Sequence, residues 1–325
     1  MHVRTTAPEW LFHNSARPVS YSDQFIDVGI IQPNGLEMDP KATFHACQAL
    51  HRRLPKLIEQ EVAFIKNQRI DLVVGDIPPL GFEIAAQANI PSAAVTNFTW
   101  DVIYRAYASK HPGFEPLVDE MTGFYRNAAL ALTLPYPCDM SMFTRRKPIP
   151  WISRNSTLTR QQARAIFGLP PNRTIVLLSF GGIGFDNLPW QRLSELSEYF
   201  FIATGSIEHK SNNLLVLSVA QGSYADLLRA VDAVVTKPGY GIVADVLAQR
   251  LPTLYTERGE FPEYPCLVQA LTELATAEFI PQADLLSGEI RSYLNRLLNK
   301  ERNWPAVSLS GAEAAADEIL GLLEA

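Results

Sequence analysis

The sequence predicts an α/β protein made of two domains, each built around a parallel sheet. Three observations support this prediction. The chain has 325 residues, which suits two domains of about 150 residues each. Short β-branched runs alternate with helical stretches through both halves, a pattern typical of parallel sheets. Several of these runs are apolar without interruption, as expected of strands that helices cover on both faces.

The composition is that of a folded chain. Hydrophobic residues make up 47% of the sequence and charged residues 19%, so a sizeable core can form. The net charge is −6 and no basic block is longer than Arg145-Arg146-Lys147, which argues against a nucleic-acid-binding protein. No run approaches the roughly 18 apolar residues of a transmembrane helix, and the N-terminus has no signal pattern. We therefore expect a cytoplasmic protein without a transmembrane segment.

The three cysteines support the same compartment. Cys47, Cys138 and Cys266 are isolated, odd in number and never in CxxC spacing. The sequence therefore predicts neither a disulfide framework nor a zinc site.

In the N-terminal half, β-branched or apolar runs predict a series of strands. They are Val3 to Thr6, Phe25 to Ile31, Asp71 to Gly75, Pro91 to Thr96 and Ala129 to Leu134. Asn34-Gly35 predicts a turn, and Asp39-Pro40 opens a helical region that reaches about Gln68 with an interruption at Pro55. The Pro-rich, basic stretch up to Pro150 is interpreted as the interdomain linker.

Polar residues follow two neighbouring strands of this half. Asp76 comes directly after one buried strand, and Asn97, Trp100 and Asp101 follow the next. Since ligands of open α/β sheets bind at the carboxyl ends of the strands, these residues predict one wall of a cleft. Two simpler interpretations stay open: Asp76 caps the following helix, and Trp100 is a core aromatic residue rather than a sugar-stacking one.

The C-terminal half repeats the alternation. Thr159 and Gln162 form a capping box for a helix to about Phe167. The strand Thr174 to Phe180 leads into Gly181-Gly182, interpreted as a glycine loop at the cleft. Further elements follow from their patterns: strands at residues 200–203 and 214–217, and helices at residues 265–277, 283–298 and 311–323.

The stretch from Ala233 to Glu263 predicts a strand, a glycine turn, a helix, a second strand and an acidic loop. Gly239 and Gly241 lie at the turn, where we expect positive φ. Such a turn leaves backbone N–H groups free at a helix N-terminus, which favours an anion such as a phosphate. Asp245 lies one helical turn further on, within reach of the hydroxyls of a bound nucleotide.

The loop after the second strand carries Arg258, Glu260 and Glu263, at the edge of the sheet where ligands bind. Two alternatives stay open. The glycines are also what any strand-to-helix turn needs, and charged loop residues are commonly solvated.

These residues carry a resemblance to a known family. The motifs are Lys237-Pro238-Gly239-Tyr240-Gly241 with Asp245, Leu251-Pro252, residues 258–263, residues 71–76, residues 95–101 and Phe180-Gly181-Gly182. They resemble nucleotide-sugar glycosyltransferases of the GT-B architecture, which has two Rossmann-like domains. More specifically, they resemble the glycosyltransferase-like N-terminal region of plant L-arabinokinase and its stand-alone bacterial relatives.

The resemblance implies a domain division and a set of roles. An acceptor-side domain spans residues 1–147, a donor domain spans residues 148–310, and a terminal helix at residues 311–325 crosses back to the first domain. The expected donor-binding residues are Gly181, Gly182, Lys237, Gly239, Tyr240, Gly241, Asp245, Arg258, Glu260 and Glu263. Backbone N–H groups would hold the diphosphate without a metal or other cofactor. Asn97 and Trp100 are expected on the acceptor side, and Asp76 or Asp101 as the base; the acceptor is not identified.

One part of the family pattern is absent. In the family a Gly/His-rich loop after the first strand of the N-terminal domain supplies the base, and no such loop precedes Val3. The relatives also have a glutamate where this chain has Asp245. We therefore expect the natural chain to extend upstream of Met1 by a strand and this loop, since a missing central strand would leave its neighbours unpaired.

The alternatives to a transferase are a non-catalytic nucleotide-sugar sensor or partner subunit, and a sugar-nucleotide epimerase. A sugar kinase is disfavoured because the sequence has no glycine/serine-rich kinase loop.

Overall fold

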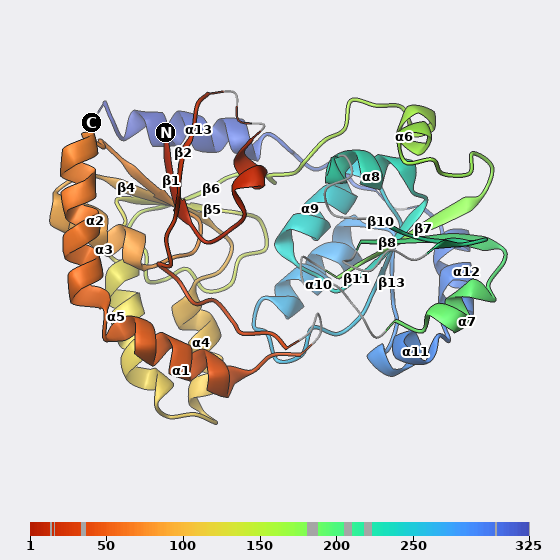
Figure 1. The fold of residues 1–325 in the computed structure, drawn as a ribbon, viewed down its shortest axis with the longest axis horizontal. Helices are drawn as coiled ribbons and strands as arrows, with labels where there is room; N and C mark the ends of the chain where they lie inside the picture. The colour runs from red at the N-terminus through yellow and green to blue at the C-terminus, as the bar shows by residue number, and fades with distance from the viewer. Residues whose placement is uncertain are drawn as a thin grey trace.

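The protein consists of two Rossmann-like halves that lie side by side (Figure 1). The structure, a computed structural model, describes residues 1–13, 15, 17–33, 37–180, 188–204, 210–217, 223–302 and 304–324. Among these residues no helix is long and apolar enough to span a bilayer. Parallel strand pairing dominates both halves, so the predicted α/β class is confirmed.

The elements of the N-terminal half follow the predicted order. They are β1 (His2–Thr5), the 3-10 helix η1 (Glu9–Phe12), β2 (Ser20–Asp23), α1 (Pro40–His51), α2 (Leu54–Gln68), β3 (Val73–Gly75), α3 (Leu80–Ala88), β4 (Ser92–Thr96), α4 (Trp100–Ala108), α5 (Phe114–Tyr125), β5 (Leu130–Thr133) and β6 (Arg146–Pro148). The helical region is interrupted beside Pro55, as predicted, because proline is tolerated only in the first turn of the second helix.

The strands of this half form two separate sheets. A four-stranded parallel sheet has the order β3-β4-β5-β6, and β1 pairs in parallel only with β2. Among the described residues nothing pairs with the second edge of β3 or of β1, and Val74 in β3 is 52% exposed. An apolar side chain on an open strand edge is uncommon in a finished sheet.

The predicted strand at Phe25 to Ile31 is wrong. The strand lies earlier, at β2, and residues 24–33 run as coil apart from a bend at Pro33. The backbone N–H of Ile31 donates to Thr43 Oγ1 at 3.0 Å instead of to a neighbouring strand. Ile26 and Val28 pack against helices. The apolar residues of this run therefore hold a coil on the helices and do not form a strand of a sheet.

The C-terminal half contains a seven-stranded sheet. Its elements are α6 (Arg160–Ile166), β7 (Thr174–Ser179), α7 (Trp190–Ser194), β8 (Tyr199–Thr204), β9 (Lys210–Ser211), β10 (Leu214–Leu217), α8 (Tyr224–Ala230), β11 (Ala233–Thr236), α9 (Tyr240–Gln249), β12 (Thr253–Tyr255), α10 (Tyr264–Leu274), β13 (Ala277–Phe279), α11 (Gln282–Ser287), α12 (Arg291–Asn299) and α13 (Gly311–Gly321). The strand order is β13-β12-β11-β7-β8-β10-β9, and only β9 is antiparallel.

Helices cover both faces of this sheet. The core on one face includes residues of α8, α9 and α10, and the core on the other includes residues of α7, α11 and α12, on opposite sides of the strands in Figure 1. The capping box of Thr159 and Gln162 begins α6, as predicted. The helix expected at residues 283–298 is two helices, because Gly288 ends α11 with φ +85°.

The two halves are connected by two neighbouring segments. The stretch expected as linker begins later than predicted, since β6 adds its residues to the N-terminal sheet. Trp151 N–H donates to Ser308 O and Gly311 N–H donates to Trp151 O, both at 3.1 Å. α13 then packs through Ala315 and Ile319 on the core beneath β5. In Figure 1 it lies across the N-terminal half.

Candidate functional site

A hydrogen bond between Asn97 and Glu263 joins the two halves. Asn97 follows β4 and donates from Nδ2 to Glu263 Oε1 at 2.7 Å, and both side chains are buried. Glu263 precedes α10 and also pairs with Arg258. Arg258 donates to Pro238 O at 3.0 Å and lies over the Phe261 ring at 4.0 Å. Asn97, predicted at the end of β4, therefore lies beside Arg258 and Glu263, predicted after β12, where the two halves meet.

Asp76 lies at the end of β3, next to this cluster. Its side chain is exposed to solvent. The surrounding protein nevertheless displaces part of its hydration, which raises the pKa of Asp76 to about 6. The negative charges of Glu263 and Asp27 raise this pKa further. An accessible carboxylate with a pKa near neutrality is suited to accept a proton. Of the two predicted carboxylates, Asp76 is the exposed one and has the raised pKa, and its role as a base stays a prediction.

The second predicted carboxylate, Asp101, has a different environment. It is 2% exposed, in the first turn of α4, and its Oδ2 accepts from Thr122 Oγ1 of α5 at 2.8 Å. The other oxygen is buried without a partner among the described residues. Asp101 therefore points into the packing between two helices, where an acceptor hydroxyl has no access.

Asp27 is a site residue that the sequence analysis did not identify. It lies in the coil after β2 and accepts from the Trp100 indole Nε1–H at 2.6 Å and from the Val28 N–H at 2.9 Å. Burial raises its pKa to about 6, although these hydrogen bonds act in the opposite direction. No periodic pattern marks such a residue, and only its position beside Trp100 and Asp76 shows its relevance.

Trp100 is part of the core. It is 8% exposed and stacks on Tyr104 with ring centroids 5.7 Å apart. Its backbone N–H donates to the Tyr125 hydroxyl, which donates to Ile77 O beside Asp76. Trp100 thus links the backbone near Asp76 to the carboxylate of Asp27, and its expected contact with an acceptor stays a prediction.

The N-terminus of α9 forms the opposite wall. Gly239 caps the helix in an extended conformation with φ −139°, and Gly241 lies inside the first turn, so the predicted positive φ values are wrong. A Cβ at Gly241 would meet no described atom within 4 Å. Gly241 thus leaves open space beside the start of the helix, whose N-terminal N–H groups favour an anion.

Lys237 brings a positive charge to the same wall. Its Nζ donates to Gln32 Oε1 of the N-terminal half at 3.0 Å. Burial and the charge of Arg258 lower its pKa to about 8, so the side chain is mainly cationic at neutral pH. Two cations next to a helix N-terminus favour binding of a phosphate or diphosphate.

Asp245 is held by a partner that the sequence did not reveal. It is buried in α9 and accepts from Arg154 N at 2.8 Å and Arg154 Nε at 2.9 Å. Tyr240 stacks on Trp151 with ring centroids 5.2 Å apart, and its hydroxyl accepts from Ile152 N–H at 3.3 Å. Both side chains contact the segment between the domains, and their roles in donor binding stay predictions.

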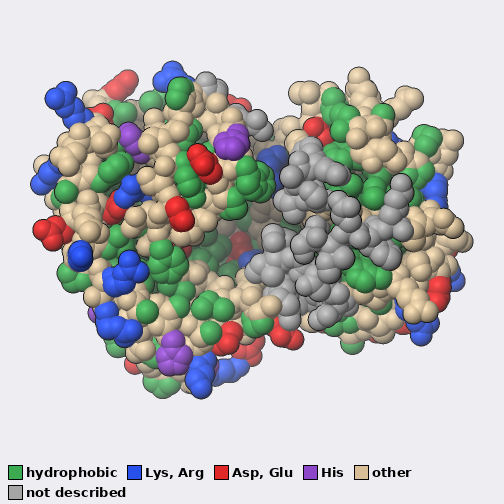
Figure 2. Space-filling view, in the orientation of Figure 1, with side chains coloured by type: hydrophobic (Ala, Val, Ile, Leu, Met, Phe, Trp, Pro, Cys, Tyr) green, Lys and Arg blue, Asp and Glu red, His purple; other side chains and the backbone are tan. Residues whose placement is uncertain are grey.

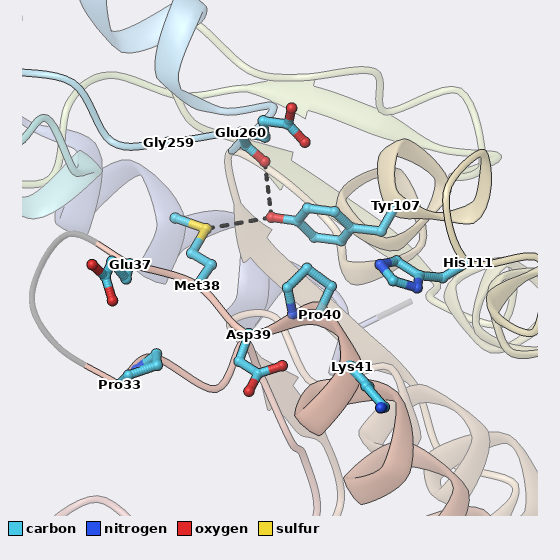
Figure 3. A pocket seen from close by; sticks show the side chains of 10 residues that line it. All are labelled: Pro33, Glu37, Met38, Asp39, Pro40, Lys41, Tyr107, His111, Gly259 and Glu260. Carbon is cyan, nitrogen blue, oxygen red and sulfur yellow. Dashed lines mark hydrogen bonds between the residues drawn. The ribbon is translucent and has the colours of Figure 1, made fainter.

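Glu260 lines a pocket of about 600 Å³ between the halves (Figure 3). It pairs with Lys110, and its carbonyl accepts from the Tyr107 hydroxyl at 2.8 Å. Figure 3 shows Tyr107 pointing between Met38 and Glu260. Figure 2 shows the molecule hollowed between the halves, with acidic and basic side chains at the floor. Of the predicted site residues, only Glu260, in the loop after β12, lines this pocket.

Two predicted residues cannot be placed. Gly181 and Gly182 lie outside the described residues. Among the residues that are described, no group of three His, Cys, Asp or Glu side chains could hold a metal ion.

One curated protein shares much of this sequence. The chain is 28% identical to L-arabinokinase of Arabidopsis thaliana over 327 residues, which covers 97% of this chain and 31% of that protein. The chain thus spans about a third of the length of this relative. No family model matches the sequence.

Solved structures resemble the fold over almost the whole chain. The calicheamicin glycosyltransferase CalG4 has a TM-score of 0.62 at 15% identity and covers 99% of this chain and 90% of its own. UGT89C1 of Arabidopsis thaliana, solved with quercetin, has a TM-score of 0.58 at 15% identity, with 99% and 84% covered. MurG of Acinetobacter baumannii has a TM-score of 0.54 at 14% identity, with 96% and 87% covered. The chain therefore has the fold of GT-B glycosyltransferases, as predicted, and is similar to a portion of L-arabinokinase.

Proposed function

We propose that the protein binds a nucleotide-diphosphate sugar between its halves and transfers the sugar to an acceptor hydroxyl without a metal. The observation that carries this proposal is the arrangement of charges. Accessible Asp76 lies on one wall, and Lys237 and Arg258 lie with the α9 N-terminus on the other. A proton acceptor opposite an anion site is what glycosyl transfer from a diphosphate requires.

The anion site is suited to the diphosphate. The α9 N-terminus has no side-chain cap at Gly239, and a Cβ at Gly241 would meet no described atom within 4 Å. Charge-assisted hydrogen bonds to a phosphate contribute roughly 1.5 to 3 kcal/mol each. Lys237 would neutralise the negative charge that develops on the leaving diphosphate.

Asp76 would act as the base. Its carboxylate accepts the proton of the acceptor hydroxyl while the hydroxyl oxygen forms a bond to the anomeric carbon of the sugar. The bond between that carbon and the diphosphate oxygen breaks, and its electron pair leaves with the diphosphate. Burial, and after it the charges of Glu263 and Asp27, raise the pKa of Asp76, which makes Asp76 a stronger base.

The experiment is a binding and turnover measurement with a panel of nucleoside diphosphates and their sugar conjugates. Calorimetry and thermal shift identify the nucleotide, and release of nucleoside diphosphate reports donor hydrolysis or transfer. If none of the panel binds, the proposal is wrong.

A non-catalytic nucleotide-sugar sensor is the second candidate. The observation that favours it is the pairing of Asp245 with Arg154, which covers a carboxylate expected to contact the donor. A sensor would bind one conjugate of the panel without releasing the diphosphate, whatever acceptor is supplied.

A further inference from the structure

Arg258 uses one of its three side-chain nitrogen atoms for hydrogen bonds to the described residues. Its Nη1 donates to Pro238 O at 3.0 Å and to the carboxylate of Glu263. Its Nε is buried, and neither Nε nor Nη2 has a hydrogen-bond partner in the described part of the chain. The N–H groups of these two nitrogens point the same way along one edge of the guanidinium group, so together they can bind two oxygens of an anion. We call them the free edge of Arg258.

The guanidinium group is held in place before any ligand binds. Besides its two hydrogen bonds, it lies over the Phe261 ring at 4.0 Å, and 13% of the side chain is exposed. An ordered side chain loses little conformational entropy when a ligand binds. A buried donor without a partner is also unfavourable, and an anion on the free edge removes this penalty.

The position of Arg258 places it at the predicted anion site. Pro238, whose carbonyl accepts from Arg258, lies between Lys237 and Gly239, the residue before the first turn of α9. A Cβ at Gly239 would lie 3.9 Å from Arg258 Nη1. The pKa of Lys237 is lowered by burial and then by the charge of Arg258, so the two cations repel each other. An anion bound between them relieves this repulsion.

Asn97 of the N-terminal half fixes the other end of this arrangement. Its Nδ2 donates to Glu263 Oε1 at 2.7 Å, while Glu263 Oε2 accepts from Arg258. Asn97 is 4% exposed and Glu263 1% exposed. Asn97 therefore holds the carboxylate that holds Arg258, and a residue of one half sets the orientation of a cation in the other.

We propose that the free edge of Arg258 binds a phosphate group of the donor through two parallel hydrogen bonds, and that Asn97 and Glu263 are positioning residues that hold this edge beside the start of α9. The inference rests on the proposed binding of a nucleotide-diphosphate sugar and adds how its diphosphate is recognised. It also gives Glu263 a role other than direct contact with the donor. Affinity for the diphosphate then depends on a contact between the halves that the ligand does not touch.

The test measures binding of inorganic pyrophosphate to the full chain by calorimetry. Arg258→Lys keeps the positive charge but lacks the two parallel N–H groups, and it should weaken binding about 10- to 100-fold. Asn97→Ala should weaken binding about three- to tenfold, the effect of one hydrogen bond. Circular dichroism verifies that each variant is folded, and Asn97→Ser replaces Asn97→Ala if the latter does not fold.

Asn127 provides the matched control for Asn97. Its Nδ2 donates to Glu83 Oε2 at 2.7 Å, and this amide–carboxylate pair lies on the surface of the N-terminal half. Asn127→Ala removes the same kind of hydrogen bond, and the affinity for pyrophosphate should equal that of the wild type.

A double-mutant cycle separates positioning from a general loss of structure. If Asn97 acts through Arg258, Asn97→Ala should have little further effect on affinity in the Arg258→Lys protein, because the edge that Asn97 positions is gone. A structural role alone predicts that the two losses add. The inference is overturned if the losses add, if Arg258→Lys binds pyrophosphate as tightly as the wild type, or if the wild type does not bind it.

The outcome is separate from that of the proposed function. If the pyrophosphate results are as expected but no sugar conjugate binds or reacts, the inference holds and the transferase proposal fails. If sugar is transferred while Arg258→Lys keeps wild-type affinity, the transferase proposal holds and the inference fails.

Discussion

Arg154 covers the carboxylate of Asp245 from the segment between the domains, and its guanidinium lies over the Tyr224 ring at 4.6 Å. The side chain of Asp245 is 2% exposed, whereas that of Arg154 is 58% exposed. A nucleotide hydroxyl therefore reaches Asp245 only if Arg154 moves outward, and the exposed side chain has room to do so.

The first prediction concerns this pair. If Asp245 contacts the donor, Asp245→Ala should weaken nucleotide binding by about 1 to 3 kcal/mol, because one charge-assisted contact is lost. Arg154→Ala should leave binding unchanged or stronger, since it uncovers the carboxylate. Calorimetry with the nucleoside diphosphate that binds best measures both. If both variants bind the nucleotide as tightly as the wild type does and each has a lowered Tm, the pair of Arg154 and Asp245 has a structural role only.

The second prediction concerns Asp76. Asp76→Asn should lower turnover by roughly 10²- to 10⁴-fold, the usual contribution of a general base, and leave nucleotide affinity almost unchanged. In the wild type, kcat/KM should rise as the pH increases through about 6, because the base works only when it is ionised. A rate that does not depend on pH between 5 and 7 contradicts this role.

Asp71 provides the matched control for Asp76. It is an exposed aspartate of the same segment, at the amino end of β3 and so at the opposite edge of the sheet. Asp71→Asn removes the same charge from the protein without touching the site, and its turnover should equal that of the wild type.

The third prediction concerns Lys237. Burial lowers its pKa from 10.5 to about 8, so the side chain loses its charge as the pH rises through about 8. Affinity for a nucleoside diphosphate should fall over that range. Lys237→Arg should keep its affinity to higher pH, because arginine stays charged. Titration calorimetry at several pH values measures this difference.

The lowered pKa of Lys237 also makes the free energy of unfolding depend on pH. Between about 8 and 10.5 the unfolded chain binds more protons at this position than the folded chain. The contribution of Lys237 to the free energy of unfolding therefore increases with pH in this range.

Lys66, in the last turn of α2, is a suitable control for the binding experiment. Lys66→Met should not alter the pH profile of binding.

The fourth prediction concerns Gly311. A Cβ at this position would lie 2.2 Å from Pro150 O and 2.7 Å from Trp151 O, which are backbone atoms that have little room to move. Gly311→Ala should lower the free energy of unfolding by about 1 to 3 kcal/mol, as overpacking does. Chemical denaturation measures the loss.

Gly321 lies in the same helix and serves as the control for Gly311. A Cβ there meets no described atom within 4 Å. Gly321→Ala should change the free energy of unfolding by less than about 0.5 kcal/mol. Similar losses in both variants would contradict the steric explanation, because alanine itself favours a helix more than glycine does.

Much of the C-terminal half was predictable because its signals are local. The run from Ala233 to Tyr255 forms β11, α9 and β12 as predicted, and Thr159 begins α6 through a capping box. In both places neighbouring residues determine the structure: buried β-branched runs form the strands, and a side chain satisfies free N–H groups at the helix start.

The remainder depends on contacts between distant segments. Asp27 lies in a coil and becomes part of the site only through Trp100, and Arg154 becomes a partner of Asp245 only because the segment between the domains passes α9. The apolar run around Val28 predicts a strand, but in the structure it is a coil in which Val28 packs against helices. A single sequence has no signal for such tertiary partners.

The position of α13 has a consequence for the order of synthesis. The half that leaves the ribosome first contains β5 and the residue after β6, and the apolar side chains Leu130, Leu132 and Ile149 there pack against Ala315 and Ile319. These partners are translated only after the sheet of the C-terminal half. The N-terminal half therefore stays incompletely covered during translation of the other, and its final packing waits for the helix made last.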